Sequence, residues 1–93
     1  MGRASKRKPA RLAEKLLQIR LALGLSQNEL IRRLELNDEL MQASISGYEL
    51  GTRIPPLPVL LRYAEVAGVC TDVLINDKLD LPDKLPAKPK HRT

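Results

Sequence analysis

The sequence is poor in the residues that build most catalytic and metal sites. It has no Trp or Phe, one Cys and one His. A single Cys excludes an intrachain disulfide and a thiolate metal cluster. A single His, at position 91, argues against Ser-His or Cys-His hydrolases and His-ligated metal enzymes. We therefore expect an aliphatic core, no catalysis, no metal and no cofactor.

The sequence also lacks an apolar run of the length and flanks that a signal peptide or a membrane-spanning helix needs. Its 93 residues suffice for one small domain. We expect a cytoplasmic protein and no membrane partner.

The excess of positive over negative charge lies at one end of the chain. The formal net charge of +5 lies in residues 1–11, whereas residues 12–69 carry −1 and residues 70–93 carry +1. Residues 1–10 are expected to form a disordered basic arm, because they contain too little apolar surface to pack. Prolines and alternating charges predict a flexible tail at 81–93. The folded domain is predicted to span 11–80.

Helical spacing of apolar residues predicts five short helices and a compact all-α fold. Ser26 and Glu29 form a capping-box pattern that starts the second helix. The other helices are predicted at 11–23, at 38–50, at 57–67, and from a Thr71 or Asp72 cap through Ile75.

The same spacing predicts which side chains point inward. The third helix is expected to bury Met41, Ile45 and Tyr48, and the fourth to bury Leu57, Leu60, Leu61 and Ala64. Cys70 is expected to be a small buried hydrophobe. Tyr48 and Tyr63 are expected in the core with their hydroxyls at its edge.

Three blocks in order resemble the phage-repressor-like (Xre, Cro/cI-type) helix-turn-helix domain. They are Leu16–Arg20 followed by Gly24–Leu30, then Ile45–Gly51 followed by two prolines, then Leu60–Val69. The resemblance covers residues 12–76. It implies a lambda-repressor-like DNA-binding domain in which the third helix lies in the major groove.

Three departures from the family pattern lie close together. Ile31 stands where the family has a small residue, and Glu35 stands where it has a turn glycine. About four extra residues separate Leu34 from Gln42. A longer connection would remove the need for a tight glycine turn, and four residues are close to one helical turn. We therefore predict an extra N-terminal turn on the third helix. A lengthened second helix or a bulged loop is the alternative.

The resemblance assigns residues to base edges and to phosphates. Gln42, Ala43 and Ser44 match base-reading positions, and Ser46 also faces outward; the alternative is that they are solvated helix residues. Ser26 and Gln27 match phosphate contacts at a helix N-terminus, although Ser26 is also a plain N-cap. Thr52 and Arg53 match a second phosphate-contacting segment, with an exposed loop cation as the alternative for Arg53.

Two further groups have different expected roles. Arg20 and Glu49 match a buried ion pair that orients the third helix. The arm residues are expected to follow the DNA backbone or enter the minor groove, or else to form a solubilising tail; they are Arg3, Lys6, Arg7 and Lys8.

The leading hypothesis is a sequence-specific double-stranded DNA-binding transcriptional regulator that acts as a homodimer on paired half-sites. Such a protein is expected to be associated with the nucleoid. Asp38 and Glu39 oppose it, because acids at the start of a recognition helix repel phosphate. They could instead accept from cytosine amino groups or face a protein. The alternatives are therefore the antitoxin of a toxin–antitoxin pair and a protein-interaction module that has lost DNA binding.

Overall fold

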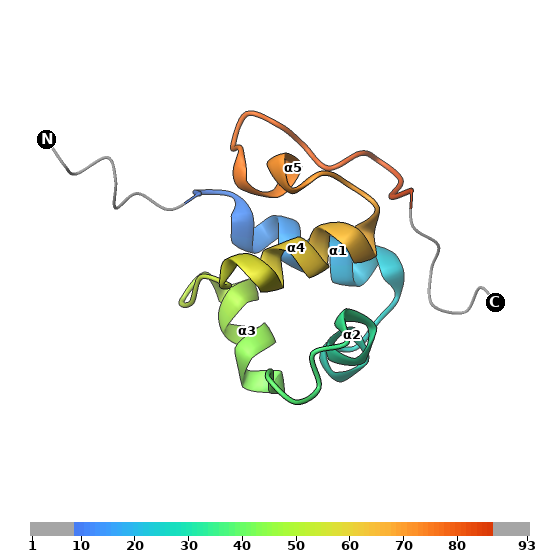
Figure 1. Ribbon diagram of the computed structural model, residues 1–93. Helices are drawn as coiled ribbons and strands as arrows, with labels where there is room; N and C mark the ends of the chain where they lie inside the picture. Colours follow the sequence, from blue (N-terminus) through green and yellow to red (C-terminus); the bar gives the residue numbers. More distant parts are fainter. Residues whose placement is uncertain (1–8, 87–93) are drawn as a thin grey trace, which may run out of the picture.

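The computed structural model describes residues 9–86, and this part of the chain is entirely helical and irregular structure. The helices are α1 Leu12–Leu23, α2 Gln27–Leu34, α3 Gln42–Leu50, α4 Leu57–Ala67 and α5 Thr71–Ile75. Helices α1 and α4 lie in the middle, with α2 and α3 on one side and α5 on the other (Figure 1). The predicted all-α, five-helix fold is confirmed.

The core is mostly aliphatic, with Tyr48 and Tyr63 as its aromatic members, and is shared by all five helices. Leucine and isoleucine recur every three or four residues along α1 and α2, so each helix presents one apolar face. The fully or nearly fully buried members include Leu12, Leu16, Ile19, Leu23, Leu30, Leu34, Ile45, Leu60 and Leu74. Among the described residues, no helix has the length and apolar character to cross a membrane.

The helix ends that frame α2 follow from local sequence. Gly24 ends α1 in the left-handed conformation at φ 71°, which costs glycine little. The Ser26 hydroxyl then accepts a hydrogen bond from the Glu29 N–H at 3.0 Å. The Glu29 carboxylate accepts one from the Ser26 N–H at 2.8 Å. The predicted capping box is therefore confirmed, and α2 begins where its pattern indicates.

The extra residues inside the motif form a loop rather than helix. The Leu36 carbonyl accepts hydrogen bonds from the N–H groups of Glu39 and Leu40, at 3.0 and 2.9 Å. Leu36 and Leu40 are partly buried against the core, whereas Met41 is 67% exposed. The predicted extra helical turn from residue 38 is wrong, because Leu40 takes the inward place expected for Met41. Helix α3 begins at Gln42, and the bulged-loop alternative is the one observed.

The longer connection keeps a left-handed turn at Glu35. This residue has φ 62° and is the one non-glycine residue with positive φ among residues 9–86. Its N–H bonds to the Arg32 carbonyl at 3.0 Å, and the Leu36 N–H bonds to the Ile31 carbonyl at 3.2 Å. The expectation that extra length would make this geometry unnecessary is wrong, because the α2 carbonyls still need donors.

The inward face of α4 differs from the prediction. Leu57 is 78% exposed and Leu61 is 50% exposed, whereas Leu60 and Ala64 are buried as predicted. The remaining buried positions of α4 are Val59, Tyr63 and Ala67. The buried face of α4 is therefore rotated about the helix axis relative to the predicted face, because Tyr63 and Ala67 lie toward the core.

Three smaller predictions are also wrong. Cys70 is exposed and occupies the N-cap position of α5, so neither Thr71 nor Asp72 is the cap. The Tyr63 hydroxyl lies inside the core, without a hydrogen-bond partner in the described part of the chain, rather than at its edge. Burial strongly raises the pKa of Tyr63.

The start of α1 is capped by a residue from the far end of the domain. The Asp77 carboxylate accepts hydrogen bonds from the N–H groups of Ala10 and Arg11, at 2.9 and 3.1 Å. The Arg11 guanidinium donates to the Asp77 carbonyl at 2.8 Å and pairs with Asp80. The two backbone hydrogen bonds lower the pKa of Asp77.

A buried lysine joins α1 to the end of α5. Lys15 is 0% exposed, and its Nζ donates to the carbonyls of Val73 and Asn76 at 2.7 and 3.0 Å. These carbonyls have few donors inside so short a helix, so the ammonium group caps α5. Burial lowers the pKa of Lys15. Leu81 and Leu85, which the sequence placed in the tail, also pack partly against the core.

Replacing Asp77 with Asn should lower the melting temperature at neutral pH, because Asn lacks the charge that favours a helix N-terminus. The folded-state pKa of Asp77 is lowered. Its stabilisation is therefore complete above the unfolded-state pKa and is lost as pH falls through the lower folded-state pKa. The melting-temperature difference between Asp77→Asn and wild type should shrink in that acid range.

Thermal unfolding followed by circular dichroism between pH 7 and pH 2 measures this difference. Asp83→Asn, at an exposed aspartate, is the matched control and should melt like wild type throughout. A difference for Asp77→Asn that stays constant down to pH 2 would contradict the cap.

Candidate functional site

The Glu49 carboxylate is the point at which α1 and α3 are joined. Its Oε2 lies 2.7 Å from Arg20 Nε, and its Oε1 lies 3.0 Å from Arg20 Nη2. The side chains of Arg20 and Glu49 are 16% and 6% exposed. Arg20 Nη1 also donates to the Leu25 carbonyl at 3.0 Å. The hydrogen bond to Glu49 raises the pKa of Arg20, and the pair fixes α3 against α1.

The same carboxylate extends a chain of hydrogen bonds toward the surface. Gln27, the first residue of α2, donates its Nε2 to Glu49 Oε1 at 3.1 Å. Gln42, the first residue of α3, donates its Nε2 to Gln27 Oε1 at 3.1 Å. The N-termini of α2 and α3 are thus tied together by side chains, and both lie at the solvent end of a buried ion pair.

Each of these amides keeps part of its hydrogen-bonding capacity. A glutamine side chain has two N–H donors and one carbonyl acceptor with two lone pairs. Gln42 uses one donor within the protein, which leaves one N–H and the carbonyl oxygen. Gln27 uses its acceptor and one donor, which leaves one N–H. At the surface, Gln42 therefore offers one donor and one acceptor, and Gln27 offers one further donor. We call this pair of amides the reading edge.

The N-terminus of α2 adds donors next to this edge. The Ser26 hydroxyl accepts from Glu29 N–H and keeps its own proton to donate. The first N–H groups of a helix have no acceptor within it, and the helix dipole makes this end favourable for an anion. Ser26 is exposed and Gln27 is half-buried. Both are therefore placed where a phosphate could approach.

The remaining predicted positions of α3 differ in exposure. Gln42 and Ala43 are exposed, whereas Ser44 and Ser46 are half-buried. Ser44 Oγ accepts from the Met41 N–H at 3.2 Å, so this hydroxyl helps to start α3. The most accessible part of the helix is its first turn.

The segment after α3 folds back on that helix. The Thr52 hydroxyl donates to the Gly47 carbonyl at 3.3 Å. Arg53 is exposed, and its stem lies against Gly47. Asp38 and Glu39 are exposed in the loop that precedes α3. The predicted arm residues lie outside the described residues; they are Arg3, Lys6, Arg7 and Lys8.

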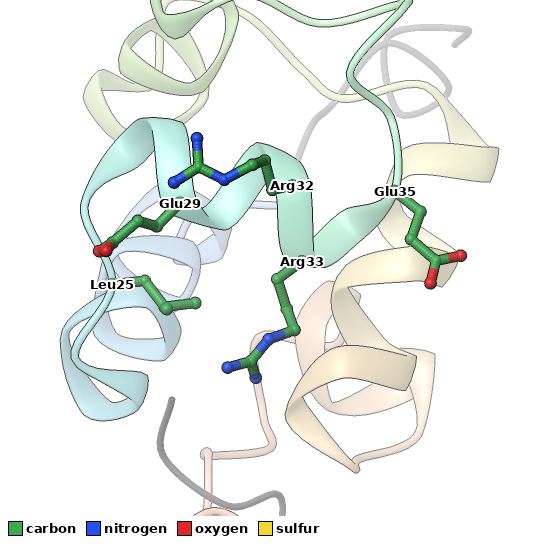
Figure 2. A pocket seen from close by; sticks show the side chains of 5 residues that line it. All are labelled: Leu25, Glu29, Arg32, Arg33 and Glu35. Carbon is green, nitrogen blue, oxygen red and sulfur yellow. The ribbon is translucent and has the colours of Figure 1, made fainter. Parts of the chain in front are cut away.

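A surface hollow on the outer side of α2 is a weaker candidate. It has a volume of about 370 Å³ and is lined by Leu25, Glu29, Arg32, Arg33 and Glu35. Figure 2 shows the guanidinium groups of Arg32 and Arg33 on different sides of the helix. They do not converge on one anion. Residues 9–86 contain no cluster of His, Cys, Asp and Glu that could hold a metal ion.

Sequence reasoning missed two features of this surface. The bond between Gln27 and Gln42 joins residues 15 apart, and a signal for it is that each opens a helix of the motif. The contact of Arg53 with Gly47 had a signal too, since a glycine inside a predicted helix requires a reason.

A family model described as a helix-turn-helix domain matches residues 11–77 of the chain. The match includes every described residue of the surface above. No curated protein and no solved structure matches the chain.

Replacing Glu49 with Gln should lower the free energy of unfolding by about 3 kcal/mol, because it leaves the largely buried Arg20 guanidinium without a counter-charge. Urea denaturation measures the loss. The control is Glu35→Gln, which removes one of the two carboxylate partners of Arg62, an exposed carboxylate 3.6 Å away, and leaves Glu65 as the other. That substitution should cost less than about 1 kcal/mol. Equal losses for the two variants would show that the Arg20–Glu49 pair does not hold α3.

Proposed function

The chain belongs to the helix-turn-helix domain family, and from this premise we propose that it is a sequence-specific transcriptional regulator that binds double-stranded DNA. In this proposal α3 is the recognition helix and enters the major groove with its first turn toward the base edges. The finer assignment is to the phage-repressor-like (Xre) type, and it rests on the sequence blocks quoted above.

The observation that carries the proposal is the orientation of Gln42 by Gln27. An adenine presents the N7 acceptor and the N6 amino donor side by side in the major groove, and glutamine binds both. The N–H and carbonyl that Gln42 keeps free form the complementary pair. Because the second N–H is occupied by Gln27, the amide is held in one orientation before DNA arrives. Ala43 lies next to it and could contact a thymine methyl group.

Phosphate contacts would flank this reading edge. We assign Ser26 and Gln27 to one phosphate, because the α2 N-terminus and the remaining Gln27 N–H both favour an anion. We assign Thr52 and Arg53 to another, with Arg53 supplying a full charge. Phosphate contacts set the register of a protein on DNA, whereas base contacts set its specificity. Ser44 and Ser46 are the further base-contact candidates, although both are half-buried.

The charge distribution supports a role for the basic arm. Residues 12–69 carry a net charge of −1, and residues 1–11 carry +5. A nearly neutral folded domain has little long-range attraction for DNA. We therefore assign the electrostatic attraction to DNA to four arm residues, Arg3, Lys6, Arg7 and Lys8. One nine-residue recognition helix reads few base pairs. We therefore propose a homodimer on two half-sites.

Duplex DNA from the region upstream of the protein's own gene should bind more tightly than mixed-sequence duplex of the same length. Affinity for both should fall steeply with salt, because each neutralised phosphate releases counterions and contributes about −0.9 to the slope of log K against log salt. Fluorescence anisotropy with labelled duplexes measures both quantities.

Equal affinity for the two duplexes would contradict the proposal that the protein is a sequence-specific regulator. An affinity that does not depend on salt would contradict the proposed phosphate contacts. Absence of DNA binding, together with capture of the product of a neighbouring gene, would favour the protein-interaction module. DNA binding together with such capture would favour the antitoxin.

Gln42→Ala should change which duplexes bind rather than weaken all of them equally. Loss of a bidentate adenine contact removes about 1–3 kcal/mol of discrimination against the wrong base. Selection from a randomised duplex library, followed by sequencing, measures the preference at each position. The matched control is Gln18→Ala, at an exposed glutamine of α1, which should select the wild-type sequences. Uniform weakening across the library would show that Gln42 does not read bases.

A further inference from the structure

Gly47 lies inside α3 at a place where a side chain has no room. A methyl group built on its Cα would stand 2.8 Å from Cδ and 3.0 Å from Cγ of Arg53. Ordinary contacts of such carbons lie between 3.4 and 4 Å. The aliphatic stem of Arg53 therefore occupies the space that a side chain at position 47 would need.

The backbone of Gly47 holds the same arginine from the other side. Its carbonyl accepts hydrogen bonds from the N–H groups of Thr52 and Arg53, at 3.0 and 3.2 Å. It also accepts from the Thr52 hydroxyl at 3.3 Å. One glycine thus fixes both the main chain and the side chain of the segment that follows α3.

Conformational freedom does not explain this glycine. Gly47 has no positive φ, unlike Gly24, Gly51 and Gly68. A glycine inside a helix destabilises it relative to alanine, so its presence here is a cost with no benefit to the helix itself. The feature that needs a glycine at this position is the close approach of Arg53.

The charge that this contact positions is unpaired. Arg53 is exposed, and it forms no ion pair with another residue of the described range 9–86. It is also the single charged residue between Leu50 and Leu61. A guanidinium held next to the recognition helix and left without a carboxylate is suited to a phosphate.

We propose that Gly47 is a positioning residue for DNA binding. Its missing side chain lets the Arg53 stem lie across α3, and this places the guanidinium against a backbone phosphate. The inference rests on the proposed function, since it assumes that α3 meets DNA. It adds that Gly47 lowers the stability of α3 and, in return, leaves the space that Arg53 needs to reach one phosphate.

The test is Gly47→Ala, because helix stability and DNA binding should then change in opposite directions. The clashing atoms belong to a flexible side chain, so Arg53 can swing away. The urea midpoint of unfolding should stay level or rise, since alanine favours the helix. Affinity for a labelled mixed-sequence duplex should fall, and the slope of log K against log salt should become shallower by about 0.9. Between 50 and 200 mM salt, wild type should then lose about threefold more affinity than the variant.

Arg53→Gln and the double variant complete a cycle. Arg53→Gln should match the shallower slope, and Gly47→Ala/Arg53→Gln should be no weaker than Arg53→Gln alone. Lys78→Gln controls for loss of one positive charge elsewhere, because Lys78 follows α5 and α5 packs on α1 and α4. Its slope should equal that of wild type. If Gly47→Ala unfolds at a lower urea concentration than wild type, the binding of all four proteins is compared without urea and at low temperature, where the variant is folded.

Two results overturn the inference. One is a Gly47→Ala variant with the wild-type slope beside an Arg53→Gln variant with a shallower slope, because Arg53 would then not need the space. The other is additive losses in the double variant. Failure of the proposed function looks different, since wild type itself would then show no salt-dependent binding to duplex DNA.

Discussion

The arrangement of the motif depends on the carboxylate of Glu49. It bonds to Arg20 of α1 through both oxygens and to Gln27 of α2 through one, while its own backbone belongs to α3. Three helices are therefore fixed by one side chain. Burial makes the arrangement sensitive, because a charge inside a protein is tolerated only while it is paired and hydrogen-bonded. The surface edge formed by Gln27 and Gln42 takes its orientation from this buried pair.

The sequence predicts those parts of the fold that depend on neighbours along the chain. The Ser26–Glu29 capping box, the glycine at the end of α1 and the five helices all follow from local pattern. The buried contact of Lys15 with α5 and the cap of α1 by Asp77 do not. These contacts join residues about 60 positions apart, and local periodicity carries no information about such pairs.

The loop before α3 shows how a register error arises. Helical spacing back from Ile45 reaches Met41, and a helix from residue 38 would bury it. Leu36 and Leu40 compete for the same place, and both pack against the core. Periodicity alone cannot decide between Leu40 and Met41, because each is apolar and they are adjacent. The site residues are less affected, because Gln42, expected inside the third helix, still belongs to α3 and is its first residue.

The position of the extra residues has a consequence for the surface. An added turn of helix would have lengthened α3 by about 6 Å along its axis and put Asp38 rather than Gln42 in its first turn. Placed in the loop instead, the extra residues leave Gln27 and Gln42 in contact. Their acids, Asp38 and Glu39, then lie in the loop that precedes α3 rather than in the helix. The first turn of α3 carries no charged side chain, and it exposes the amide of Gln42 and the methyl group of Ala43. The buried Glu49 network orients the amides at this turn through Gln27, so the geometry of their free hydrogen-bonding groups depends on a buried ion pair.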